Sequence, residues 1–267
     1  MSRTRFILAW VGVVFITVMI IFPLYWGIRT ALADNYDRQL LPTDLTLDNY
    51  RFLFKGGRFV SNIENSLIVS IGSVIATLPL ALLGGYALAR FDFPGKRYSI
   101  ILLVLPLLPA IAVLVALIMY VRMLGLYNTL YSVILATTVF SLPFSVWMVR
   151  GFMLSIPREI EEAALIDGCG PIAALFRIAM PLAAPGLIAV CIFVLISAWN
   201  NYLFSFAFTT KTPLQVVPAA LLAYITSWGT NYGGMNAAAT VAMLPPLVFF
   251  LVFQKWFVQG MLAGSSK

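Results

Sequence analysis

Residues 159–186 read EIEEAALIDGCGPIAALFRIAMPLAAPG, and this polar stretch decides how the chain is organised. Its first nine positions carry three glutamates and one aspartate, although only 10% of the 267 residues are charged. Pro157 suits the first turn of a helix, and the glutamates that follow lie near the positive N-terminal end of that helix. Gly168 stands where a helix would end in a left-handed residue, and Gly170-Pro171 starts a second short helix. The stretch therefore predicts two short helices that are joined by a bend and exposed to water.

The chain on either side of this stretch is apolar enough for a lipid bilayer. Its residues are 61% hydrophobic, and its mean hydropathy is +0.96. Several charge-free runs exceed the roughly 20 residues that a helix needs to cross a bilayer. We expect an all-α membrane protein, because irregular backbone cannot face lipid unsatisfied. The expected spans, about six, are residues 6–28, 64–89, 98–121, 129–149, 186–208 and 237–257.

Basic residues near the ends of these runs predict the orientation. Arg3 and Arg5 precede the first run, and no small-x-small cleavage site follows it, so it is interpreted as a signal anchor. With the N-terminus on the cytoplasmic side, an even number of spans returns the C-terminus to the same side. The stretch 159–186 then lies in the longest cytoplasmic loop. The first outer loop, residues 29–62, holds five basic residues and is the exception to the positive-inside rule.

Several functions are excluded or disfavoured by missing residues. The chain has no histidine, which removes any Ser-His-Asp or Cys-His triad and disfavours a zinc site. It has no G-x-x-x-x-G-K-[ST] motif and cannot bind ATP through a P-loop. The basic residues are too scattered for a nucleic-acid surface. We therefore expect no enzyme activity, no metal and no cofactor in this chain, and a driving force that comes from a partner.

The two short helices favour a docking element over a simple connection. Ala163 and Ala164 keep part of the surface small, so another backbone can approach closely. A solvated amphipathic loop that only joins two spans remains the alternative interpretation.

The spacing of this stretch resembles a known family motif. Glu162-Ala163-Ala164, then Asp167-Gly168, then Pro181 is similar to the EAA motif of binding-protein-dependent ABC importer permeases. The resemblance implies a type I importer fold with a cytoplasmic coupling helix that docks in a cleft of the ATPase. It assigns docking to six residues: Glu162, Ala163, Ala164, Asp167, Gly168 and Pro181. Cys169 and Met180 depart from the usual Ala and Leu, and neither change puts docking in doubt.

Further stretches resemble the carbohydrate-uptake branch of that family, and within it the smaller permease subunit of maltose-type importers. They include LTLDNYRFLF (45–54), YALARFDFPGKR (86–97), GLYNTLYSVIL (125–135) and AWNNYLF (198–204). The resemblance implies one permease domain over residues 1–267. Residues 1–61 form the first helix and outer loop, and residues 261–267 a cytoplasmic tail. The core is 62–260, with its coupling loop at 151–185.

The same resemblance implies the assembly. The partners are a second permease subunit, two ATPase subunits that bind ATP and Mg²⁺, an extracytoplasmic solute-binding protein and the lipid bilayer. The location is the bacterial cytoplasmic (inner) membrane, with several passes and both termini in the cytoplasm.

A sugar that crosses a membrane needs hydroxyl partners and aromatic faces, and polar residues in membrane helices usually face the bundle interior. Candidates for the substrate path are Asn65, Ser66, Trp199, Asn200, Asn201 and Tyr202. Hydrogen bonding between helices is the alternative role for these polar side chains.

We expect import of a mono-, di- or oligosaccharide. The alternatives within transport are glycerol 3-phosphate, a polyamine or an amino acid. A secondary transporter is disfavoured because no second related half is present, and an intramembrane enzyme is disfavoured because no histidine is available.

Overall fold

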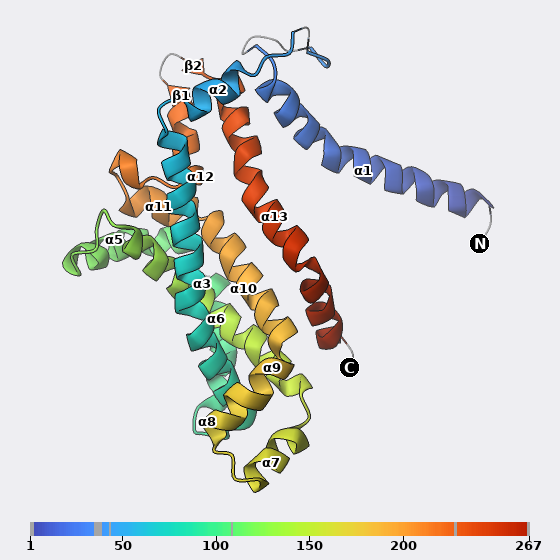
Figure 1. The fold of residues 1–267 in the computed structure, drawn as a ribbon, viewed down its shortest axis with the longest axis vertical. Helices are drawn as coiled ribbons and strands as arrows, with labels where there is room; N and C mark the ends of the chain where they lie inside the picture. The colour runs from blue at the N-terminus through green and yellow to red at the C-terminus, as the bar shows by residue number, and fades with distance from the viewer. Residues whose placement is uncertain (1–2, 35–38, 43, 108, 227–228, 266–267) are drawn as a thin grey trace. The chain divides into compact units, whose positions relative to one another are not determined.

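The computed structural model describes residues 3–34, 39–42, 44–107, 109–226 and 229–265, and nearly all of the regular structure in them is helical (Figure 1). The η segments are 3-10 helices, except η4, which is a π-helix. In chain order the elements are α1 (Arg3–Ala31), α2 (Asp48–Phe54), α3 (Arg58–Arg90), η1 (Lys96–Ile100), α4 (Ile101–Val104), η2 (Leu105–Leu107), η3 (Ala110–Val113), α5 (Leu114–Met123), α6 (Leu130–Ser155), α7 (Arg158–Ile166), α8 (Pro171–Ala174), η4 (Leu175–Ala179), α9 (Met180–Leu182), α10 (Ala184–Trp199), α11 (Tyr202–Phe208), η5 (Thr212–Leu214), α12 (Val217–Ala220), η6 (Leu221–Tyr224), β1 (Ile225–Thr226), β2 (Gly229–Thr230) and α13 (Tyr232–Ser265).

Within the described residues, four helices are long and apolar enough to cross a membrane: Ala9–Ala31, Arg58–Arg90, Leu130–Ser155 and Tyr232–Lys255. A fifth span results when Pro171–Leu182 and Ala184–Trp199, which are bent by 80° at a break, are counted together. The predicted all-α membrane class is confirmed. The continuous spans are fewer than the six that the sequence predicts.

The predicted span at 98–121 is where the structure differs most. It consists of η1, α4, η2, η3 and α5, and its longest apolar helical part is Ala110–Met123. Pro106 lies inside η2, and Pro109 caps η3 with an extended backbone at φ −63° and ψ 115°. Each proline removes a backbone donor and disfavours helical geometry in the residue before it. Two prolines this close together therefore break a segment that is apolar enough to be one helix.

The other spans differ mainly at their ends. The helix expected at 64–89 begins already at Arg58, the one expected at 129–149 runs on to Ser155, and the one expected at 237–257 is part of α13. The span expected at 186–208 is interrupted between α10 and α11, at residues 200–201.

The described chain divides into two compact units. Unit 1 is Met1–Val60 with Ala220–Leu244. In unit 1, the Asn49 side chain of α2 donates to the carbonyls of Ala31 and Ala33 at 3.0 and 2.9 Å. Tyr50 and Thr240 share a hydrogen bond of 2.9 Å. These bonds hold α2 against the end of α1 and the start of α13. Strands β1 and β2 pair antiparallel, with Ile225 opposite Thr230.

Unit 2, which is Ser61–Ala219 with Pro245–Lys267, contains most of α3. This helix is inverted compared with a helix of a soluble protein. Much of its buried face between residues 66 and 81 is small and polar, with Ser66, Ser70, Ser73, Thr77 and Ala81 at 0–2% exposure. Large apolar residues on the other face, such as Ile68 and Ile75, are 52% and 68% exposed. In a membrane the large apolar side chains belong in lipid, and small or hydroxyl side chains belong between helices. The pattern therefore fits a bilayer.

The small residues bring α3 very close to α6. A Cβ on Gly85 would lie 2.6 Å from Val149, and a Cβ on Gly72 would lie 2.7 Å from Ile134. At Gly85 a Cβ would also lie 2.9 Å from the Arg150 backbone nitrogen, so this approach requires glycine, whereas at Gly72 the tip of the Ile134 side chain would have to move.

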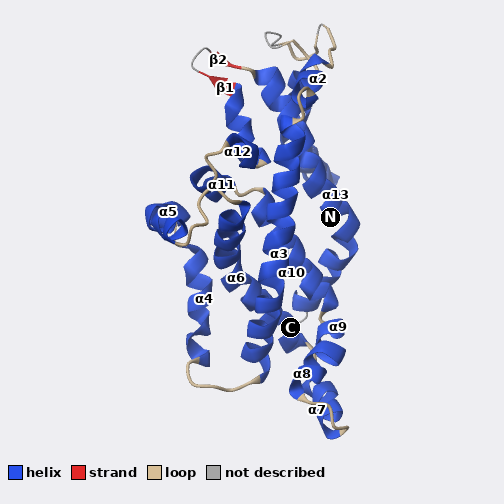
Figure 2. Ribbon diagram, turned by 60° about the vertical axis from the view of Figure 1, so that its left-hand side comes forward, coloured by secondary structure: helices blue, strands red, loops and turns tan. Residues whose placement is uncertain are grey.

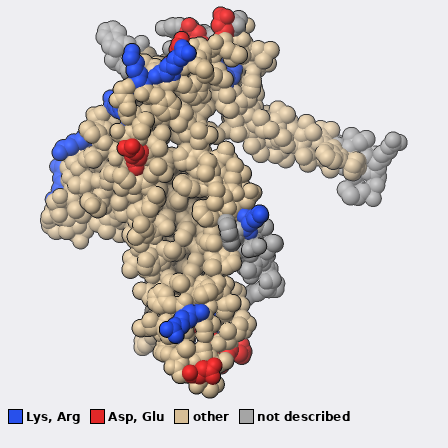
Figure 3. Space-filling model, in the orientation of Figure 1, with Lys and Arg blue, Asp and Glu red and all other residues tan. Residues whose placement is uncertain are grey.

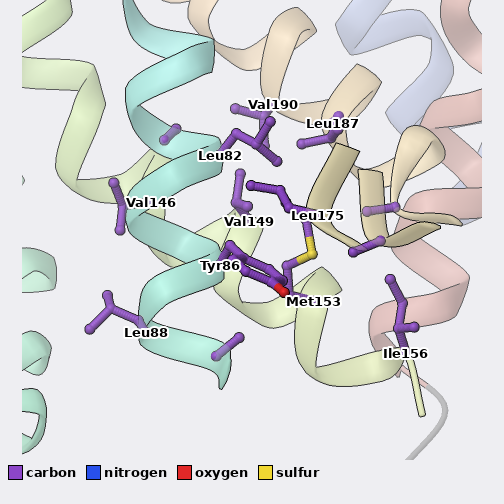
Figure 4. Close-up of a cluster of buried hydrophobic side chains, with 14 of the residues drawn as sticks. Leu82, Tyr86, Leu88, Val146, Val149, Met153, Ile156, Leu175, Leu187 and Val190 are labelled. Carbon is purple, nitrogen blue, oxygen red and sulfur yellow. The ribbon is translucent and has the colours of Figure 1, made fainter. Parts of the chain in front are cut away.

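A buried apolar cluster fills the end of unit 2 near α7. Figure 4 shows Tyr86 of α3, Val149 and Met153 of α6, and Leu175 of η4 in this cluster. Val149 and Met153 are 0% exposed, and Leu175 is 2% exposed. The cluster joins α3, α6 and η4 just beside α7, which lies at this end of unit 2 with α8 (Figure 2).

Candidate functional site

The candidate site is the elbow, which we define as α7, the turn at residues 167–170 and α8. Pro157 precedes α7, and Glu159 and Glu161 lie in its first turn, where the helix dipole favours acids. At the other end, Gly168 has φ +87°. Its N–H donates to Leu165 O at 3.1 Å, and the N–H of Cys169 donates to Ala164 O at 3.0 Å. These two bonds form a Schellman cap, so the predicted left-handed bend at Gly168 is confirmed.

A buried ion pair fixes α7 to the end of α3. Arg90 Nε donates to Glu161 Oε1 at 2.8 Å, and Arg90 Nη2 also contacts this oxygen. Tyr86 Oη donates to Glu161 Oε2 at 2.9 Å. Arg90 Nη2 reaches the Ile156 carbonyl as well, at 3.0 Å. The side chains of Arg90 and Glu161 are only 8% and 6% exposed, so water screens this pair weakly.

A second arginine adds to this anchor. Arg158 Nη2 donates to the Ala89 carbonyl at 3.2 Å, in the last turn of α3. The carbonyls at the C-terminal end of a helix lack intrahelical partners and carry partial negative charge, so a cation is favourable there.

The other face of α7 is open. Glu162, Ala163 and Asp167 are exposed, and Figure 3 shows acidic side chains on the surface at this end. Two large apolar side chains stand beside them, with Ile166 86% exposed and Ile172 74% exposed. Exposed isoleucines beside acidic residues are typical of a surface that binds a protein partner.

The remaining residues predicted to dock, which are Ala164, Gly168 and Pro181, lie in three different surroundings. Ala164 is buried at 8% exposure and packs toward the interior of unit 2. Gly168 and Pro181 are exposed, Gly168 in the turn and Pro181 at the start of α9. The structure therefore brings five of the six residues together in the elbow, and Pro181 lies outside it on α9.

A pocket of about 150 Å³ opens between the anchor and the exposed face. It combines aromatic, basic and acidic side chains, which are Tyr86, Arg90, Phe91, Arg158, Glu161, Glu162, Leu165 and Pro171.

The loop after α3 is held by a short-range ion pair. Lys96 Nζ donates to Asp92 Oδ1 at 2.8 Å. This hydrogen bond and the lysine charge lower the pKa of the exposed Asp92 carboxyl below its ordinary value.

The predicted substrate-path residues on α3 hold a distant backbone segment. The Asn65 amide donates to the carbonyls of Pro213 and Gln215 at 2.8 and 3.1 Å. Ser66, at 2% exposure, accepts from the Val217 N–H at 2.9 Å. Both side chains thus hydrogen-bond to another segment of the chain, and their predicted place on the substrate path stays a prediction.

The other candidates surround the break between α10 and α11. Asn201 caps α11 by accepting from Phe204 N at 3.0 Å, and its amide donates to Thr137 Oγ1 at 2.9 Å. Trp199 is buried at 3% exposure. Asn200 is exposed, and Tyr202 is 38% exposed. Of the six candidates, Asn200 and Tyr202 are exposed, Asn65 and Asn201 are partly buried, and Ser66 and Trp199 are buried.

The sequence reasoning missed Glu161, Arg90 and Tyr86 as functional residues. Both Tyr86 and Arg90 lie in the quoted stretch YALARFDFPGKR, where Arg90 was expected only as a basic residue that holds a cytoplasmic loop in water. The signal that could have indicated this ion pair was Arg90 at the end of one predicted span together with Glu161 in the long loop. Glu161 is an acid outside the six residues that the motif assigns to docking. Among the described residues, no group of three or more His, Cys, Asp or Glu side chains is placed to hold a metal ion.

Comparison with known proteins gives one family. Residues 68–263 match the family described as "Binding-protein-dependent transport system inner membrane component".

Two curated relatives are similar over nearly the whole chain. The diacetylchitobiose uptake system permease protein DasC of Streptomyces coelicolor is 32% identical over 275 residues, covering 100% of both chains. The trehalose transport system permease protein SugB of Mycobacterium tuberculosis is 33% identical over 253 residues, covering 92% of each.

A solved structure has the same fold. A chain of a bacterial ABC transporter involved in the import of the acidic polysaccharide alginate superposes with a TM-score of 0.82 at 20% identity. The match covers 96% of this chain and 99% of that one, and it confirms the importer permease fold.

Proposed function

This chain belongs to the family of binding-protein-dependent transport system inner membrane components, and on that premise we propose that it moves a saccharide across the cytoplasmic membrane by using ATP that a partner subunit hydrolyses. The family is a transport component and not an enzyme. The relatives named above are described as taking up diacetylchitobiose and trehalose. Both solutes are sugars, which favours a saccharide over glycerol 3-phosphate, a polyamine or an amino acid.

The observation that carries the proposal is the division of α7 into two faces. The Glu161 face is fixed to Arg90 inside the chain, and the Glu162 face is open with bare isoleucines beside it. A rigidly anchored helix with a free acidic and apolar face is what a docking element requires, because force on it is passed on to the rest of the chain. Since the chain has no P-loop, the partner that docks there is the natural source of ATP-driven motion. The docking residues in the proposal are Glu162, Ala163, Asp167 and Gly168, with Ala164 and Pro181 supporting them.

The proposed path for the sugar passes the break between α10 and α11. Asn200 and Tyr202 offer an amide and an aromatic ring without a charge, which suits a neutral hydroxylated solute. Interrupted membrane helices are common at the binding sites of transporters.

The proposed assembly has a second permease subunit, two ATPases that bind ATP and Mg²⁺, and an extracytoplasmic solute-binding protein. The single permease domain would span residues 1–267, with the elbow and both termini on the cytoplasmic side. The family's description supports the binding protein, and the exposed elbow supports the ATPase.

The test is the charge reversal Glu162→Lys in cells that express the whole transporter. Uptake of radiolabelled disaccharides, with trehalose and diacetylchitobiose as probes, should fall to background, while membrane insertion stays normal. Glu159→Lys is the matched control, because Glu159 is an exposed acid of the same helix that lies outside the predicted motif. Normal uptake by Glu162→Lys, or an equal loss with Glu159→Lys, would contradict docking at this face.

A further inference from the structure

α3 is anchored at both ends, to parts of unit 2 that are far apart. Its buried contacts run from Ser66 to Arg90 along one continuous helix. At about 1.5 Å per residue these two positions are about 36 Å apart. That distance exceeds the roughly 30 Å hydrocarbon core of a bilayer. One helix therefore connects two anchors that are farther apart than the hydrocarbon core of a bilayer is thick.

The first anchor is the ion pair between Arg90 and Glu161. It ties the end of α3 to α7 through the Arg90 guanidinium, and to the end of α6 through the Ile156 carbonyl. Its two charged side chains are each more than nine-tenths buried. Removing either partner would leave the other charge buried and uncompensated, so the pair holds its geometry strongly.

The second anchor holds the segment at residues 213–217. Asn62, at 3% exposure, donates to the Gln215 carbonyl at 2.7 Å. Asn65 donates to Pro213 O and to the same Gln215 carbonyl, and Ser66 accepts from Val217 N. Three side chains of α3 therefore satisfy backbone groups of a segment that is about 150 residues away in sequence.

Between the anchors, one face of the helix packs closely against α6. Gly72 and Gly85 bring α3 into close contact with Ile134 and Val149 of α6. The helix also stays continuous through Pro79, and Thr77 contacts Ser141 of α6 at 3.4 Å. Because tightly packed helices move as rigid bodies, a displacement at one end of α3 must appear at the other end or break a close contact.

We infer that α3 is a rigid link between α7 and the segment 213–217, with Arg90 and Glu161 as the positioning pair at one end and Asn62, Asn65 and Ser66 as the clamp at the other. Its use in transport rests on the proposed function, since it would carry motion of the docked elbow to the far side of the membrane. The link itself is a property of this chain and can be tested without any partner.

The test is amide hydrogen exchange on the purified full chain in lipid nanodiscs. In Arg90→Met, exchange should speed up in residues 158–166 and also in residues 211–217, in the second segment on the order of tenfold. The Val217 amide is the most direct reporter, because it donates to Ser66. Ala164→Leu is the matched control, because it is also expected to destabilise the chain but keeps the pair of Arg90 and Glu161, so it should not speed up exchange in residues 211–217 as Arg90→Met does.

A substitution in the clamp should change exchange at the elbow. Asn65→Leu should speed up exchange in residues 158–166, because coupling between two sites is reciprocal. If Arg90→Met does not yield a folded chain, Glu161→Gln, which keeps an acceptor for Arg90, makes the same test.

The inference is overturned if these variants raise exchange in 158–166 alone and residues 211–217 keep the wild-type rate. That result would give the ion pair a purely local role. The proposed docking of an ATPase is tested by the uptake experiment, so this result would leave that proposal unaffected.

Discussion

The two faces of α7 carry neighbouring glutamates in opposite surroundings. Glu161 is 5% exposed and accepts from Arg90 and Tyr86, while Glu162, the next residue, is exposed. Neighbours on a helix are about 100° apart around the axis, so two identical side chains can face the interior and the solvent. The comparison teaches that the acidic residues of this stretch have two different roles. Glu161 fixes the helix to the rest of the chain, and Glu162 is free to contact a partner.

The largest expected effect is on the inner face. Arg90→Met should lower the free energy of unfolding by about 3 kcal/mol, because it leaves the Glu161 carboxylate buried without its cation. Thermal unfolding of the purified chain in detergent measures this loss. The double variant Arg90→Met with Glu161→Leu should recover most of the stability, since no charge then stays buried. Glu162→Leu is the control on the outer face and should change stability little; an equal loss with it would remove the distinction between the faces.

An intermediate effect is expected at the paired alanines. Ala164→Leu should destabilise the chain by about 1–3 kcal/mol, because Ala164 is buried and a larger side chain overpacks its site. Ala163→Leu, on the open face, should leave the unfolding temperature nearly unchanged. The same thermal measurement decides, and equal shifts in both variants would show that the faces do not differ in packing.

The smallest effect is expected at the bend that ends both faces. Gly168→Ala should cost about 1 kcal/mol, because alanine is strained at φ +87° although a Cβ would meet no atom within 4 Å. Gly170→Ala is the matched control, since Gly170 has φ −72° and equal space around it. Gly168→Asn should fall between the two in unfolding temperature, because asparagine tolerates this conformation better than alanine. If Gly170→Ala lowers the unfolding temperature as much as Gly168→Ala does, backbone strain at φ +87° is not the cause of the loss.

The sequence predicted those features that depend on local pattern. The charge-free runs predicted the membrane class. The glycine at the end of a predicted helix predicted the bend at Gly168. The break at Pro106 and Pro109 was missed because hydropathy does not register backbone donors. The burial of Glu161 was missed because its partner Arg90 is 71 residues away, and no local pattern joins them. The same holds for Asn65, whose amide holds a segment 148 residues away.

The inverted face of α3 also has a consequence for how the chain is made. Its span has a mean hydropathy of 2.2 in spite of the row of serines and threonines on one side. Such hydroxyls can donate to carbonyls one turn earlier, so α3 can enter the bilayer as a single helix before any neighbour is present. The hydroxyl row would then act after insertion, as the surface on which α6 recognises α3. We therefore expect insertion to depend on the large residues of α3, and its later pairing with α6 to depend on its small ones.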